Sequence, residues 1–249
     1  MIKFSTFLFI IFVCFSCNRR IEVTEEVLKR TTEISKIGAI IDMNQDWYDN
    51  KDNDVIVELY NDEGFEINSE KIKVFVNDVE VPYCLMPKLY YDTSTSYRLK
   101  KIPVVNDEFK FEVVLPSGKK YLLGTVKTIS EVKMKNVKYN KKGNINEPYQ
   151  FSWSNMKDFN EMEIYRGMDM PTIENVTISD PDGPSVKHKI KPDGNWTIPT
   201  SFYTKPKSKI SFLSINFYCT KNGVLNKDIL PDSKITIFSE FDVVDVNFK

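Results

Sequence analysis

The chain has 249 residues, with 34 basic and 35 acidic side chains, and 41% of its residues are hydrophobic. A near-neutral chain of this size lacks the basic excess that binding to nucleic acid requires, and its apolar content is sufficient for packed cores. Aromatic residues are abundant and glycine is scarce, and the periodic segments are rich in Val, Ile, Phe, Tyr and Thr. That composition is typical of strands and predicts an all-β fold.

The first segment in chain order is an apolar run, Phe4–Ser16, which follows Lys3 and precedes Cys17. Its length of 13 residues fits a signal peptide. A helix of that length reaches about 20 Å, whereas the hydrocarbon core of a bilayer is ~30 Å thick, which disfavours a transmembrane anchor. The residues from Val13 to Cys17 resemble a bacterial lipobox. The resemblance implies cleavage after Ser16 and acylation of Cys17.

We therefore expect a signal peptide over residues 1–16 and a polar tether over residues 17–35. Cleavage by the ordinary signal peptidase would leave the same first residue without a lipid, and this alternative stays open. Asn18 follows the cysteine, where Asp would resemble an inner-membrane retention signal. The resemblance to lipoproteins thus implies the bacterial outer membrane, and the periplasmic and surface-facing orientations both stay open.

Residues 36–129 contain closely spaced strand patterns with turn residues between them. Asn77-Asp78 stands between two valine-rich runs, so a two-residue loop would pair Val76 with Val79 and Val74 with Val81. Some seven short strands in this range predict an immunoglobulin-like β-sandwich.

Residues 130–249 carry a second set of strand patterns. The segments Phe151–Ser154, Glu163–Arg166 and Ser214–Gly223 resemble strands of fibronectin type III domains, in which a tryptophan such as Trp153 is buried. The resemblance implies a fibronectin III-like β-sandwich. In the last strand the apolar positions change from odd to even numbers near Val243, which predicts a β-bulge or a strand that crosses between sheets.

Catalytic chemistry is sparse, and we expect neither an enzyme nor a cofactor. The only histidine, His188, alternates with lysines in a strand pattern and is expected to be half-buried. The motifs G-x-S-x-G, H-E-x-x-H and G-x-G-x-x-G and the phosphate-binding loop are missing. Cys84 and Cys219 remain in the mature chain. They could pair across the two domains or stay separate as buried thiols.

An acidic segment is the candidate metal site. Its oxygen ligands suit Ca²⁺, and the five aspartates of this candidate are Asp42, Asp46, Asp49, Asp52 and Asp54. An EF-hand is excluded because Trp47 stands where glycine is needed and Asn53 where the bidentate glutamate belongs. The alternative is a solvated acidic loop between two strands.

Loop aromatics are the candidate ligand-binding residues: Trp47, Tyr48, Tyr90 and Tyr91. Aromatic faces at the end of a sandwich can stack on sugar rings while nearby carboxylates accept hydrogen bonds from hydroxyl groups. The alternative is that these rings cover the end of their own core.

The whole pattern resembles the immunoglobulin-like lipoproteins of Bacteroidota. That resemblance implies a non-catalytic, lipid-anchored protein that acts in protein binding or assembly at the outer membrane. The alternative is a glycan-binding accessory lipoprotein of a polysaccharide-uptake system. A glycosidase with its paired carboxylates in the acidic segment is a third possibility, although no spacing singles out a pair.

Overall fold

The computed structural model describes residues 25–47, 52–87, 93–169, 179–180, 185–202 and 209–248. The predicted signal peptide, Cys17 and residues 18–24 of the predicted tether lie outside the described residues. The rest of the predicted tether is described, and it contains α1 and the buried residues Leu28 and Ile34, which pack in the core. The all-β prediction is confirmed, since strands dominate and the described α-helix is α1 (Glu25–Arg30). Short 3-10 turns occur at Ile34–Lys36, Met134–Asn136 and Thr200–Phe202. Within the described ranges, no helix is long and apolar enough to cross a membrane.

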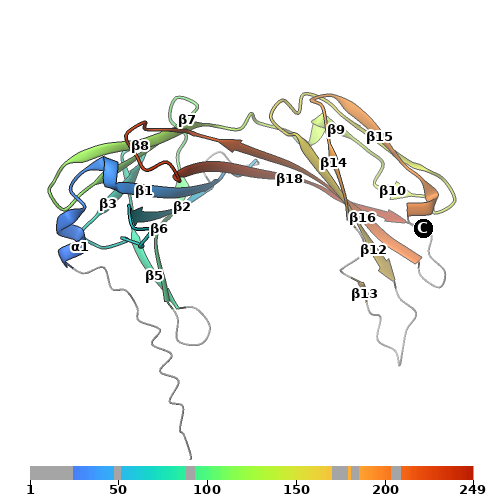
Figure 1. Cartoon of the computed structure of the whole chain (residues 1–249). Helices are drawn as coiled ribbons and strands as arrows, with labels where there is room; N and C mark the ends of the chain where they lie inside the picture. Colours follow the sequence, from blue (N-terminus) through green and yellow to red (C-terminus); the bar gives the residue numbers. More distant parts are fainter. Residues whose placement is uncertain are drawn as a thin grey trace, which may run out of the picture.

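The first sandwich has the strand order of an immunoglobulin-like domain, as predicted (Figure 1). One sheet contains, in spatial order, β1 (Ile37–Asn44), β2 (Asn53–Asn61), β6 (Thr93–Ile102) and β5 (Tyr83–Pro87). The facing sheet contains β8 (Lys120–Lys127), β7 (Glu108–Val114), β3 (Lys73–Val76) and β4 (Val79–Val81). Alternate residues of these strands are buried between the sheets, because successive side chains of a strand point to opposite faces.

The hairpin between β3 and β4 has the predicted register. Val74 pairs with Val81 and Val76 with Val79, and both turn residues have positive φ, 47° at Asn77 and 63° at Asp78. Positive φ at both positions is the geometry of a type I′ turn, which matches the twist of the strands. Of the four valines, Val79 is 39% exposed because it lies at the end of an edge strand.

The second sandwich has a fibronectin III-like strand order. Its smaller sheet contains β9 (Val137–Lys138), β11 (Tyr149–Trp153) and β15 (Gly194–Ile198). The opposite sheet is formed by β12 (Glu161–Asp169), β16 (Lys209–Asn222) and β18 (Lys234–Phe248). The short strands β13 (Ser179–Asp180) and β14 (Val186–Lys189) pair with β12, and β10 (Lys142–Gly143) pairs with β18. Trp153 is buried and its ring lies 5.8 Å from that of Phe217, as expected for a core residue.

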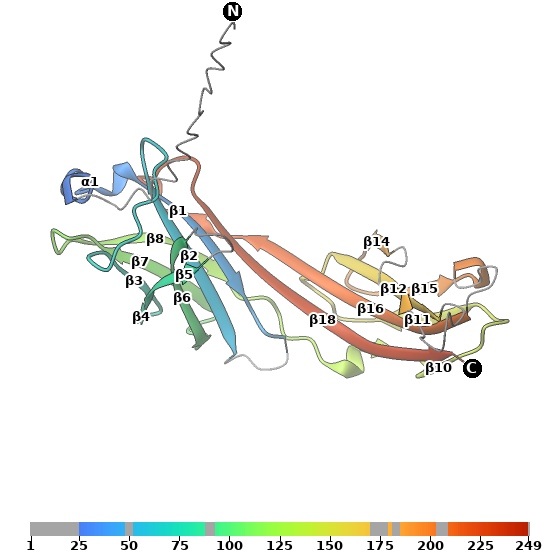
Figure 2. The same ribbon diagram turned by 90° about the horizontal axis from the view of Figure 1, so that it is seen from below.

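The two sandwiches share one ten-stranded sheet (Figures 1 and 2). The beginning of β18 runs parallel to β1, with pairs from Ile40 with Lys234 to Asn44 with Phe238. The adjoining strand β17 (Val224–Leu225) pairs with β8 on the facing sheet. The hairpin formed by β16, β17 and β18 therefore extends from the second sandwich onto the open side of the first.

The tip of that hairpin completes the first core. Its isoleucines Ile229, Ile235 and Ile237 are at most 8% exposed and belong to the buried cluster. Residues 224–238 thus lie with the first sandwich, although they follow the second along the chain. The predicted boundary between the two domains, between residues 129 and 130, stays a prediction.

The irregularity in the last strand is a β-bulge, one of the two predicted causes. Leu213 pairs with Val246 and Ile215 with Val243, so two residues of β18 face one of β16. Val243 and Val246 are both 1% exposed, which shows that the apolar face moves by one position across the bulge.

Two contacts hold the junction between the sandwiches. The side chain of Gln45 donates to the Ile129 carbonyl at 2.9 Å and accepts from the Ile129 N–H at 2.7 Å. The Trp47 ring packs edge-on against Phe241 of β18, with centroids 4.5 Å apart. The end of β1 is thereby tied both to the linker and to the second core.

Candidate functional site

The predicted aromatic site is only partly described. Trp47 is half-buried against Phe241, and Tyr48, Tyr90 and Tyr91 lie outside the described residues. The contact assigns Trp47 a packing role at the junction. A shared surface of the four rings stays a prediction.

The predicted calcium ligands are spread along two strands and a loop. Asp42 lies on β1 and Asp54 on β2, and the Asn44 amide donates to Asp54 at 3.1 Å.

The buried Asn53 accepts from the Asp46 N–H at 3.2 Å and donates to the Ile102 carbonyl at 2.8 Å. Asp52 is exposed, and Asp49 is outside the described residues. No group of three potential ligands occurs among the residues that are described, and the calcium site stays a prediction.

The histidine and the two mature cysteines have structural surroundings. His188 is half-buried, as predicted, with its ring 4.1 Å from that of Trp196. Cys84 and Cys219 are separate free thiols, as in the second of the two predicted alternatives, but only Cys219 is buried and Cys84 is half-buried. Burial raises the pKa of the Cys219 thiol to about 12, so this thiol is unreactive at neutral pH.

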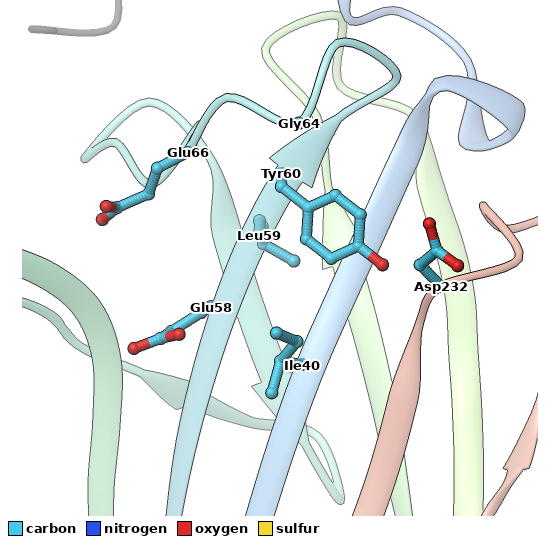
Figure 3. Close-up of a pocket in the computed structure, with 7 residues that line it drawn as sticks. All are labelled: Ile40, Glu58, Leu59, Tyr60, Gly64, Glu66 and Asp232. Carbon is cyan, nitrogen blue, oxygen red and sulfur yellow. The ribbon is translucent and has the colours of Figure 1, made fainter.

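A shallow groove lies on the outer face of the first sandwich. Its volume is about 350 Å³. The lining consists of Ile40, Glu58, Leu59, Tyr60, Gly64, Glu66 and Asp232. In Figure 3 the Tyr60 ring lies between Glu58 and Glu66 on one side and Asp232 on the other. We call this site the Tyr60 groove.

The Tyr60 ring is held flat against the neighbouring strand. Tyr60 pairs with Gly38 across β2 and β1, and a Cβ atom at position 38 would collide with the ring. Glycine at this position therefore lets the ring cover the backbone of β1. The hydroxyl points toward Asp232 and lies 3.4 Å from the Ser233 hydroxyl oxygen (Figure 3).

A tight loop after β2 positions Glu66. The Asn61 side chain accepts from the backbone N–H of Glu63 and Phe65, at 3.1 and 2.8 Å, and Gly64 has a φ of 79°. The Glu66 carboxylate accepts from the Asn68 amide at 2.8 Å and from the Thr95 hydroxyl. These hydrogen bonds hold Glu66 in a fixed position on one wall of the groove.

The opposite wall comes from the distant hairpin. The Leu230 N–H donates to the Ile37 carbonyl at 2.9 Å, and the Ala39 N–H donates to the Ser233 hydroxyl at 3.1 Å. Asp232 stands between these two anchoring points and is exposed. The groove is therefore complete only when the hairpin is docked on the first sandwich.

The groove is anionic. Glu58, Glu66 and Asp232 form no ion pair with a lysine or arginine in the part of the chain that the structure describes. Ile40, which is 38% exposed, and the Tyr60 ring supply an apolar floor. Such a site attracts positively charged or hydroxyl-donating groups and repels anions.

Sequence reasoning missed this groove. Alternation along β2 could have placed Glu58 and Tyr60 on the outer face, since Val57 and Leu59 face the core. Nothing local connects them to Asp232, because the parallel pairing of β1 and β18 brings it there.

Comparisons with known proteins give no family. No family model matches the chain, and no curated protein matches it. Fibronectin(III)-like modules of CbhA from Clostridium thermocellum match at 11% identity and a TM-score of 0.26, over 82% of this chain and 92% of that one. SGBP-B of a Bacteroides ovatus mixed-linkage glucan utilization locus, solved with a mixed-linkage heptasaccharide, matches at 10% identity and a TM-score of 0.18. That match covers 82% of this chain and 60% of the other. The function proposed below rests on neither likeness.

Proposed function

We propose that the protein is a non-catalytic binding protein of the bacterial cell envelope, anchored in the outer membrane by a lipid on Cys17. Its binding site is the Tyr60 groove, and its ligand is a protein partner that presents a lysine or arginine side chain there. The observation that carries this proposal is a set of three carboxylates without a described counter-charge around an accessible tyrosine ring.

The physical basis is complementarity of charge and shape. A guanidinium group forms charge-assisted hydrogen bonds with carboxylates and also stacks on an aromatic face. Ile40 and the Tyr60 ring would contact the apolar stem of the same side chain. Rigid positioning of Glu66 limits the ordering cost on binding.

The groove is tested with a short arginine-rich peptide as the probe. The double variant Glu58→Gln/Asp232→Asn should weaken binding of the peptide by roughly tenfold in calorimetry at low salt, about 1.4 kcal/mol, because two charge contacts are lost. The matched control is Glu80→Gln/Glu131→Gln, which removes the same net charge from exposed sites elsewhere. Equal affinities of the two double variants, or no binding by the parent protein, would contradict the proposal.

The anchor is tested separately in cell fractionation. Cys17→Ser should move the protein from the membrane to the soluble fraction, because burial of acyl chains provides the attachment. Cys84→Ser, a change at a free thiol of the mature chain, should leave the protein on the membrane. Membrane attachment of the Cys17→Ser protein would show that the lipid assignment is wrong.

A further inference from the structure

The outer face of the second sandwich carries a second ordered arrangement of polar and aromatic side chains. Neighbouring positions on β12, β16 and β18, which lie side by side in Figure 2, bring these side chains together. The pairs are Tyr165 with Ser214, Asn216 with Asp242, and Tyr218 with Glu240. The residues that alternate with them are buried in the core, so these six side chains share the outer face. We call this surface the Tyr218 face.

Hydrogen bonds hold the centre of the Tyr218 face in one arrangement. The Ser214 hydroxyl donates to the Asn216 side-chain oxygen at 2.9 Å, and the Asn216 amide donates to Glu240 at 2.9 Å. A longer contact of 3.4 Å joins the same amide to the Tyr218 hydroxyl oxygen. Both ends of the Asn216 amide are thus engaged, which orients the polar groups on a strand surface that is otherwise open.

Aromatic surface lies beside these polar groups. The rings of Tyr218 and Phe238 are stacked with centroids 6.0 Å apart and an interplanar angle of 29°, and both side chains are half-buried. A solvated strand face normally carries long, mobile charged side chains. Rings that are fixed on the outer face of a sheet instead provide a surface on which another flat apolar group can stack.

The rim of the face has an excess of hydrogen-bond acceptors. Glu240 and Asp242 stand two positions apart on β18 and form no ion pair with a lysine or arginine in the described residues. Burial, followed by the repulsion and hydrogen bond of Glu240, raises the pKa of Asp242 to about 6. Two adjacent carboxyl groups without a counter-charge are stabilised by a ligand that donates hydroxyl hydrogens.

We propose that the Tyr218 face binds a neutral carbohydrate. A sugar ring would stack on Tyr218, and its hydroxyl groups would donate to Glu240, to Asp242 and to the remaining lone pair of the Asn216 side-chain oxygen. Lys187, paired with Glu163 at 3.6 Å beside this face, makes it less suited to a cationic peptide than the Tyr60 groove is. The inference concerns a site on the other sandwich and does not depend on the function proposed for the groove.

The experiment is affinity electrophoresis of the lipid-free protein in gels that contain soluble starch, arabinoxylan, galactomannan or β-glucan. At least one polysaccharide should retard the parent protein. Tyr218→Ala and Asp242→Asn should each reduce the apparent affinity by roughly tenfold, through the loss of stacking and of a charged acceptor, respectively. Asp242→Asn preserves the shape of the side chain, so it keeps the test decisive if Tyr218→Ala fails to fold.

Tyr121→Ala is the matched control, because Tyr121 is a half-buried tyrosine on β8 of the first sandwich. This variant should be retarded like the parent protein. Three results would overturn the proposal: no retardation in any gel, unchanged retardation of Asp242→Asn, or displacement of the polysaccharide by the arginine-rich peptide that probes the Tyr60 groove. The last result would place both ligands in one site.

Discussion

The two sandwiches complete their cores in different ways. The second closes with strands from its own part of the chain, and its long strands β16 and β18 continue beyond it. The first needs the tip of that hairpin, because Ile229, Ile235 and Ile237 fill the open side between its sheets. The first sandwich therefore depends on residues that follow the second along the chain, and the Tyr60 groove is complete only when the hairpin is docked.

The largest expected effect concerns the first sandwich made without the hairpin. A fragment of residues 25–129 loses three buried isoleucines, worth on the order of 2 kcal/mol each, and typical domains have only about 5–15 kcal/mol of stability. We expect this fragment to show no cooperative urea transition, whereas residues 130–249 should melt cooperatively.

Mixing the two fragments should restore the transition of the first sandwich. A cooperative transition of residues 25–129 alone, close to that of the whole protein, would show that the hairpin is an accessory strand. The parts of the chain before and after residue 129 would then fold as two independent domains.

A smaller effect is expected at the junction. Phe241 is fully buried and contacts the rings of Trp47, Phe159 and Phe217, so it packs against both halves. Phe241→Ala should lower the free energy of unfolding by about 3–5 kcal/mol, and the two sandwiches should unfold together at a lower urea concentration. Val224→Ala, at a hairpin residue that is 74% exposed, should leave the transition unchanged. Separate transitions of the two halves in Phe241→Ala would mean that the ring stabilises only the second core.

The smallest effect is electrostatic and depends on pH. Burial alone would raise the pKa of Asp158, but a hydrogen bond and ion pair from Lys221 at 2.8 Å, together with the Ser130 N–H at 2.6 Å, hold it below its ordinary value. A carboxyl whose pKa is lower in the folded state stabilises the fold above its unfolded pKa. That contribution disappears as the pH falls below about 4 toward the folded pKa.

Asp158→Asn should therefore cost on the order of 1 kcal/mol at pH 7 and almost nothing near pH 2, when urea unfolding is compared with the parent. Glu131→Gln, a change at an exposed carboxylate that pairs with Lys133 at 3.3 Å, is the control and should cost less at pH 7. If Asp158→Asn lowers the free energy of unfolding by the same amount at both pH values, Asp158 stabilises the fold through packing and not through its charge.

Local patterns predicted much of the architecture. Alternation and turn residues placed the β3–β4 hairpin in its observed register. The change of the apolar positions from odd to even numbers near Val243 predicted either a bulge or a crossing strand, and the structure has the bulge. The buried Trp153 and the half-buried His188 also followed from their immediate neighbours. These features are readable because hydrophobic period and turn chemistry act over a few residues.

The parallel pairing of β18 with β1, the docking of the hairpin and the two candidate sites were decided by tertiary structure. The pairing of two strands that lie far apart in the sequence cannot be predicted from local patterns, because the alternation along each strand is the same whichever strand it pairs with. Trp47 illustrates this limit, because its residue type predicted a loop aromatic, and only the approach of Phe241 made it a packing residue. The sequence determined which faces are apolar, and long-range packing determined which of those faces meet.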